Sequence, residues 1–162
     1  MYVAPTWLPP ASTPDADLVR SLGGGAYELR RDALGPSYRS AYGLVMLVHE
    51  RPSERRGQIR YLDEGIRTHG TSTVQSLATG TSHGCHRLFP HHALRLGGFL
   101  LRHRDHDRVG ETATRYVRTV RHHGRYRVEI DSRGYQIDFH EPIPVEVLEG
   151  TIRSKRRTPA RP

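Results

Sequence analysis

The chain has 162 residues, a formal net charge of +8 and a hydrophobic content of 35%. This length suits one domain with a sizeable core, and no apolar run is long enough to cross a membrane as a helix. The single cysteine excludes an internal disulfide. The first residues also lack the basic start and apolar stretch of a signal peptide.

The positive charge comes from 24 arginines and one lysine, Lys155, against 17 acidic residues. Such a balance suits anionic partners such as nucleic acid or a cell-wall polymer. The arginines are scattered along the whole chain, however, and a nucleic-acid-binding domain more often groups them with exposed aromatic residues. We therefore expect a solvated basic surface and no nucleic-acid partner.

The composition divides the chain into three parts. Residues 1–25 are rich in proline and glycine and are expected to form a leader or linker, with a short helical turn at Asp15–Leu22. Residues 26–150 are expected to form the folded domain. Residues 151–162 are expected to be a basic, disordered tail.

Several strands are predicted in the first half of the folded domain. Tyr27–Arg30 has strand character, and the unbroken apolar run Leu44–Val48 suits a central strand covered on both faces. Two shorter strands, Gln58–Leu62 and Gly65–Thr68, lead into His69. The sequence thus predicts that His69 lies at the end of a strand.

One convincing helix is predicted at Pro90–Arg102. Its apolar residues follow helical spacing, and proline suits the first turn of a helix. The pair Gly97-Gly98 interrupts the apolar pattern and indicates a close approach to a packed neighbour.

The last third is expected to be β structure. Strict alternation in Arg125–Asp131 and again in Tyr135–Phe139, with a turn at Ser132–Gly134, predicts a hairpin with one buried face. Alternation continues in Ile143–Val147, where two flanking prolines favour an edge strand. The overall expectation is a mainly β, sandwich-like domain with one prominent helix.

The stretch His69–Arg87 carries the chemistry. Residues 71–81 are rich in Ser, Thr and Gly and are expected to form a loop, after which Ser82-His83-Gly84-Cys85 contains the only cysteine. A buried structural thiol is the ordinary alternative for a lone cysteine. The polar, loop-forming surroundings of Cys85 favour a nucleophile instead.

A thiol attacks a carbonyl carbon as the thiolate, which needs a nearby base or a helix N-terminus. His69 or His83 could accept the proton, and the predicted helix begins a few residues after Cys85. Backbone N–H groups around Gly84 could stabilise an oxyanion, since glycine lets the chain turn tightly and lets a substrate approach.

His69-Gly70-Thr71 followed by Ser82-His83-Gly84-Cys85-His86-Arg87 resembles the signature of the L,D-transpeptidase catalytic domain (YkuD-like). That family has a His-Gly pair, a variable loop, then S/T-H-G-C, a variable residue and Asn or Arg. The resemblance covers 41–148 and implies the family's β-sandwich, with the prominent helix following the catalytic cysteine. His86 stands where the family usually has an aliphatic residue.

The resemblance implies a role for each residue of the motif. Cys85 would form a thioester with a peptidoglycan stem peptide, and we favour His69 as the base, its ring oriented by a backbone carbonyl, that of Gly70; His83 could take this part instead. The remaining motif residues would line or support the oxyanion loop (Gly70, Ser82, His83 and Gly84) or contact the substrate (Thr71 and Arg87).

The same resemblance implies the partners and the location. Transfer of the acyl group to an amine would cross-link two stem peptides, whereas transfer to water would be carboxypeptidase activity. No metal or organic cofactor is expected. Peptidoglycan lies outside the cytoplasmic membrane, so a periplasmic or cell-wall location is expected, although the chain shows no export signal. We expect no stable membrane insertion, and the oligomeric state is unreadable from the sequence.

Two other classes of protein fit parts of the sequence. His83, Cys85 and His86 lie close enough to suggest a metal site, but zinc-finger spacing and the H-E-x-x-H motif are both missing. A non-catalytic wall-binding module would fit the positive charge. Such a module would need neither Cys85 nor His69, so the acyltransferase hypothesis accounts for more of the motif.

Overall fold

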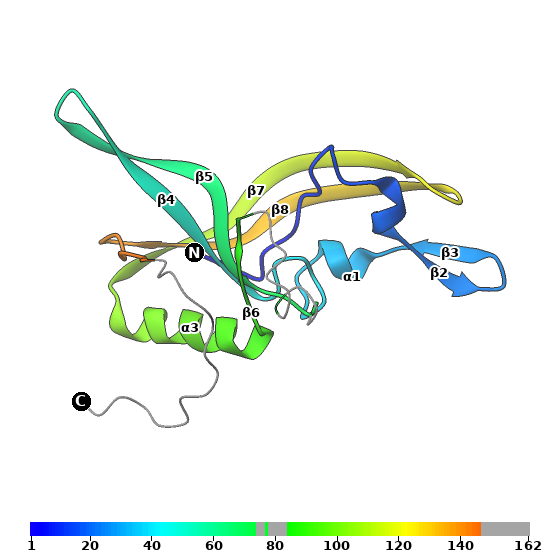
Figure 1. Ribbon diagram of the computed structural model, residues 1–162, viewed down its shortest axis with the longest axis horizontal. Coiled ribbons are helices and arrows are strands. Elements are labelled where there is room, and N and C mark those ends of the chain that lie inside the picture. The colour runs from blue at the N-terminus through cyan, green and yellow to red at the C-terminus, as the bar shows by residue number, and fades with distance from the viewer. Residues whose placement is uncertain (74–76, 78–83, 147–162) are drawn as a thin grey trace.

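The computed structural model describes residues 1–73, 77 and 84–146; residues 74–76, 78–83 and 147–162 lie outside this description. The described chain is mainly β, as predicted, with two sheets (Figure 1). The six-stranded sheet has the order β6 (His86–Leu88), β5 (Gln58–Gly70), β4 (Val45–Arg55), β1 (Tyr2–Val3), β8 (Arg125–Phe139) and β7 (His106–Arg121), and the second sheet pairs β2 (Val19–Gly23) with β3 (Ala26–Leu29).

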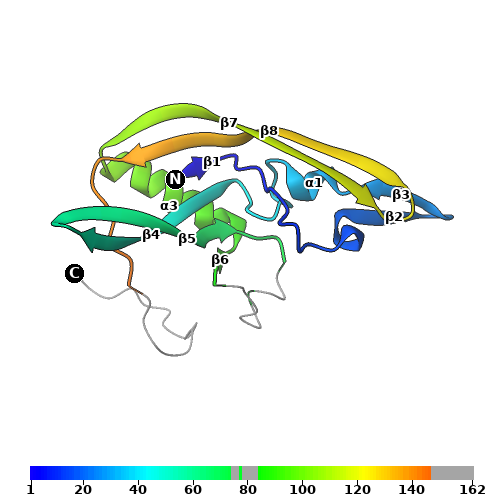
Figure 2. The ribbon, with the colours of Figure 1, turned by 90° about the horizontal axis from the view of Figure 1, so that it is seen from above.

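The helical elements whose bounds are described are η1 (Asp15–Leu18), α1 (Arg31–Leu34) and α3 (Pro90–His103). No helix in the described part of the chain is long and apolar enough to cross a membrane. The β4–β5 and β7–β8 ribbons diverge from the centre of the large sheet, where β1 joins them (Figures 1 and 2). β1 contributes only two residues, so it connects the two ribbons over a short stretch.

Residues 1–25 belong to the folded body, in contrast to the expected leader. β1 pairs antiparallel with both β4 and β8. Pro5 and Pro9 are fully buried, and the Tyr116 hydroxyl donates to the Pro9 carbonyl at 2.8 Å. The Arg118 guanidinium bonds Asp15 at 2.7 Å. Proline tolerates such positions because its missing N–H leaves no unsatisfied donor.

β5 is one continuous strand, whereas the sequence predicted two. Its pairing with β4 passes from Val48↔Arg67 to Glu50↔Asp63, which places extra residues on β5 at this irregularity. Gly65 lies within it and has φ +81°. A bulge of this kind interrupts the hydrophobic alternation without ending the strand, so the pattern resembles two short strands.

The predicted hairpin over Arg125–Phe139 is wrong. β8 runs through this whole range and pairs antiparallel with β7, a strand that the sequence analysis did not predict. Gly134, in the expected turn, has φ +102°, and a Cβ there would lie 2.6 Å from the Ala4 carbonyl oxygen. Gly134 therefore allows the N-terminal segment to pack closely against β8, and Ser132–Gly134 does not reverse the chain.

The predicted edge strand at Ile143–Val147 is also wrong for the residues described. Residues 141–146 contain no strand, and Val147 lies outside the described part. Two prolines in this short segment remove ladder donors, which outweighs the alternation of its apolar residues.

The helix α3 confirms the sequence prediction. Pro90 occupies its first turn. The basic residues Arg102 and His103 occupy its last turn, where positive charge interacts favourably with the negative end of the helix dipole. A Cβ on Gly97 would lie 3.0 Å from a Val45 side-chain carbon, so this glycine allows the expected close approach, to β4. A buried cluster around Val45 forms beneath the helix.

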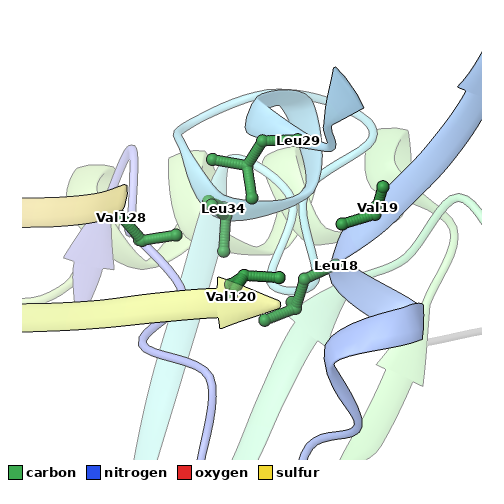
Figure 3. Packing of buried hydrophobic residues seen from close by; sticks show 6 residues of the cluster. All are labelled: Leu18, Val19, Leu29, Leu34, Val120 and Val128. Atoms are coloured by element: carbon green, nitrogen blue, oxygen red, sulfur yellow. The ribbon is translucent and has the colours of Figure 1, made fainter. Parts of the chain in front are cut away.

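A second core cluster lies at the other end of the molecule (Figure 3). Its buried side chains come from η1, β2, β3, α1, β7 and β8, and Trp7 packs against them. The members are Leu18, Val19, Leu29, Leu34, Val120 and Val128. These contacts fix the two-stranded sheet and the N-terminal segment to the end of the β7–β8 ribbon.

Gly134→Ala should destabilise the fold more than Gly110→Ala, a matched control on β7. The two glycines have nearly the same φ, +102° and +101°, but a Cβ meets backbone oxygens only at Gly134 and nothing within 4 Å at Gly110. We expect urea denaturation to show a loss of about 3 kcal/mol for Gly134→Ala and about 1 kcal/mol for Gly110→Ala. Equal losses would contradict the proposed close approach.

Candidate functional site

His69 lies at the end of β5 and is buried, with 4% of its surface exposed. Its Nδ1 lies 2.9 Å from the carbonyl oxygen of Gly70, which is the orienting contact expected from the sequence. A carbonyl can only accept, so Nδ1 carries the hydrogen. Nε2 of the neutral ring is then free to accept a proton.

The glycine after His69 is required by its neighbours. A Cβ on Gly70 would lie 3.2 Å from the Pro90 Cα. Gly43 also packs against Gly70, since a Cβ on Gly43 would lie 3.1 Å from the Gly70 Cα. This crossing brings Tyr42 beside the catalytic candidate: the Tyr42 and His69 rings are 5.3 Å apart and meet edge to face. Tyr42 therefore supports the orientation of the imidazole.

Cys85 reaches the same region through the parallel pairing of β5 and β6. His69 is opposite Arg87 and Thr68 is opposite His86. Cys85 precedes Arg87 by two residues, so its Cα lies roughly 7 Å back along the strand and about 5 Å across from β5. β6 begins at His86, so Cys85 would share the face of Arg87 and His69 if the alternation of β6 extends one residue further.

The surroundings of the thiol are polar and partly covered. Cys85 is half-buried, with its Sγ 3.9 Å from the Gly65 carbonyl oxygen. It lies within electrostatic range of Tyr42 and Arg67. Burial raises the pKa of Tyr42, Arg67 lowers it and Cys85 raises it, and the net pKa lies above the ordinary value. Tyr42 therefore stays a neutral hydrogen-bond donor at physiological pH.

Arg67 supplies a fixed positive charge beside Cys85. Its two terminal nitrogens each donate to an oxygen of Asp63 at 2.7 Å, and only 14% of its side chain is exposed. Burial opposes the charge, but the hydrogen bonds to Asp63 outweigh it and the pKa of Arg67 is raised. The same bonds hold the pKa of Asp63 below its ordinary value. A thiolate at Cys85 would be stabilised by this guanidinium.

The helix N-terminus is not close enough to serve this purpose, which corrects the sequence expectation. β6 separates Cys85 from Pro90, the first residue of α3. Three extended residues span roughly 10 Å. The helix dipole acts mainly within the first turn, so its effect on Cys85 is small.

Burial keeps the imidazole of His69 neutral. Loss of hydration lowers its pKa, the bond to Gly70 raises it and the charge of Arg87 lowers it further; the net pKa lies below the ordinary value of 6.5. A neutral ring is the form that a base requires.

The structure places the other predicted site residues differently. Ser82 and His83 lie outside the described residues. Gly84 is exposed and has φ +104°, a conformation that suits a turn before the thiol. Thr71 is buried, and its hydroxyl accepts the N–H of Thr73, so it holds the chain after β5 beneath the surface. Arg87 is half-buried on the face of His69.

Sequence reasoning missed Tyr42, Arg67 and Asp63. Arg67 precedes His69 by two residues, and one continuous β5 would have placed both on one face. The predicted strand Gly65–Thr68 already has this alternation, but nothing local distinguishes Arg67 among the 24 arginines of the chain. Tyr42 lies in a connecting segment far from the motif, so no local pattern points to it.

Three further findings concern metal ligands, a cleft and similar proteins. Among residues 1–73, 77 and 84–146, no three His, Cys, Asp or Glu side chains gather as metal ligands. A broad cleft is lined by residues of β4, β5 and β8, and Tyr42 and Arg67 form part of its lining. In searches for similar proteins, no family model, no curated protein and no solved structure matches the chain.

Acidification should destabilise the protein through its buried imidazoles. Folding lowers the pKa of His69 and of His49 below 6.5, so the unfolded chain binds more protons as the pH falls below that value. We expect the free energy of unfolding, from urea titrations, to fall between pH 7 and pH 5. The free energy of unfolding should fall less in His69→Gln, and it should fall as in wild type when the exposed His103 is replaced in His103→Gln. An equal fall in His69→Gln would contradict this linkage.

Proposed function

We propose that this protein is a peptidoglycan L,D-transpeptidase in which Cys85 is the nucleophile and His69 the base. The observation that carries the proposal is the 2.9 Å contact between His69 Nδ1 and the Gly70 carbonyl on the strand next to Cys85. This contact selects the tautomer whose Nε2 accepts a proton. The sequence motif supplies the substrate class, by resemblance alone.

Acylation follows from these groups. His69 Nε2 takes the proton of the Cys85 thiol, and Sγ attacks a carbonyl carbon of the donor stem peptide. The C–N bond of the donor breaks, the leaving amine takes the proton from His69, and a thioester remains. Backbone N–H groups near Gly84, with His83 by resemblance, would stabilise the oxyanion.

Deacylation reverses the proton path. His69 removes a proton from the acceptor amine, which attacks the thioester carbon and releases the Cys85 thiolate; the thiolate then recovers the proton from His69. Water as acceptor gives a free carboxylate instead of a cross-link. Arg67 supports both half-reactions because its charge lies beside the sulfur while the sulfur is anionic.

The proposal extends to fold, partners and location. The mainly β chain would be a variant of the YkuD-like β-sandwich, with α3 as the helix that follows the catalytic cysteine. Its partners would be stem peptides, with no cofactor. Because that substrate lies outside the cytoplasmic membrane, the protein would act in the periplasm or at the cell wall.

His69→Ala should slow alkylation of Cys85 by iodoacetamide at pH 7 by about tenfold, because the thiolate fraction falls when its base is removed. The rate is followed by intact-mass spectrometry, with His103→Ala as an exposed control. A loss in His83→Ala with no loss in His69→Ala would assign the base to His83. Equal rates in all four proteins would remove the ion-pair mechanism.

A carbapenem should add once to the wild-type protein and not to Cys85→Ala, since the family that the motif resembles is sensitive to these compounds. Incubation with peptidoglycan fragments should then yield cross-linked dimers, or trimmed stems if water is the acceptor. Both products should disappear in Cys85→Ala. A wild-type protein that forms neither the carbapenem adduct nor either peptidoglycan product would contradict the transpeptidase proposal.

A further inference from the structure

A hydrogen-bonded chain of three side chains lies on the opposite face of the strands that carry His69 and Cys85. His49 Nε2 lies 2.7 Å from the Thr68 hydroxyl oxygen, and the same oxygen lies 3.2 Å from His86 Nδ1. The two imidazole rings are 5.2 Å apart at 80°. Each member comes from a different strand, β4, β5 or β6, and all three are half-buried.

The Thr68 hydroxyl has one hydrogen and two acceptor lone pairs, so at most one of the two ring nitrogens accepts from it, and at least one donates to its oxygen. The chain therefore specifies partners and directions in a way that apolar packing does not. An aliphatic residue at position 86, usual in the family that the motif resembles, could make neither contact.

The position of this chain connects it to the catalytic pair. Thr68 directly precedes His69, and His86 directly follows Cys85. β6 is a three-residue strand at the edge of the sheet, held through three residue pairs with β5. A slip of one residue in such a strand would turn Cys85 to the opposite face.

We propose that His86, bridged through Thr68 to His49, is a positioning residue that fixes β6 in register against β5 and thereby holds Cys85 on the face of His69. The three side chains act through the strands that carry them. This inference rests on the proposed function for its catalytic meaning, although its effect on the thiol can be measured without any peptidoglycan substrate.

Metal binding does not account for the cluster. It offers two imidazoles and a hydroxyl, and no three candidate ligands gather in the described part of the chain. The Thr68 oxygen also lies between the two rings, in hydrogen-bond contact with a nitrogen of each. The geometry is that of a bridge between strands.

Thr68→Val tests the bridge because it keeps the β-branched shape and removes only the hydroxyl. We expect iodoacetamide to alkylate Cys85 about tenfold more slowly in this variant, while Thr68→Ser stays within about twofold of wild type. The melting temperature is measured alongside. Thr119→Val, an exposed threonine on β7, serves as the matched control and should alkylate at the wild-type rate.

His86→Leu provides a second variant that retains packing at the edge strand. It should slow alkylation as much as Thr68→Val, and the double variant should be no slower than either alone, because both remove the same bridge. With stem-peptide substrate, the loss should appear in kcat, because it comes from a misplaced thiol.

Alkylation of Thr68→Val at the wild-type rate, or an equal loss in Thr68→Ser, would overturn the positioning role. Losses that simply add in the double variant would do the same, because they would show two separate effects. If wild type fails to turn over stem peptides, the proposed function fails, and the alkylation series still decides whether His86 positions Cys85.

Discussion

The parallel pairing of β5 with β6 is the constraint on which the candidate site depends. It sets His69 opposite Arg87 and brings Cys85, far along the chain, to the same face of the sheet. Parallel strands require a crossover connection, which here leaves β5 at Gly70 and returns at Cys85. Gly43 and Gly70 allow close packing at the end of β5, because a Cβ at either position would press against backbone. The same crowding places Tyr42 against His69.

Two opposite electrostatic demands are met within this small region. A base must be neutral, and burial lowers the pKa of His69 accordingly. An anionic sulfur must be stabilised, and a buried cation would be costly unless it were paired. Asp63 provides the pair for Arg67 through two bonds of 2.7 Å, so the cation can remain beside Cys85. A carboxylate therefore supports the thiol indirectly, by holding the guanidinium that faces it.

The sequence predicted the features that depend on local pattern. The mainly β class and the helix beginning at Pro90 follow from spacing and composition, whereas the His69–Gly70 contact was implied by the resemblance of the motif. The sequence predictions were wrong where tertiary contacts determine the structure of a segment. Ser132–Gly134 has the composition of a turn, yet it lies within β8, where Gly134 allows the N-terminal segment to pack closely. Residues 1–25 lack periodicity because their order comes from contacts with β4, β7 and β8. Arg67 is one of 24 arginines, and no local pattern marks it as the partner of Asp63. Tyr42 lies far from the motif along the chain.

The two faces of β5 and β6 carry different groups of side chains. One face holds Arg67 and His69, the groups to which the proposed function assigns charge and proton transfer, and Cys85 lies within electrostatic range of Arg67. The other face joins three strands through Thr68 and the imidazoles of His49 and His86. Alternation along a strand makes the two functions inseparable, because whatever fixes Thr68 and His86 also fixes their neighbours. An ionisable residue after Cys85 is therefore compatible with the proposed function, since its ring contacts Thr68 on the neighbouring strand.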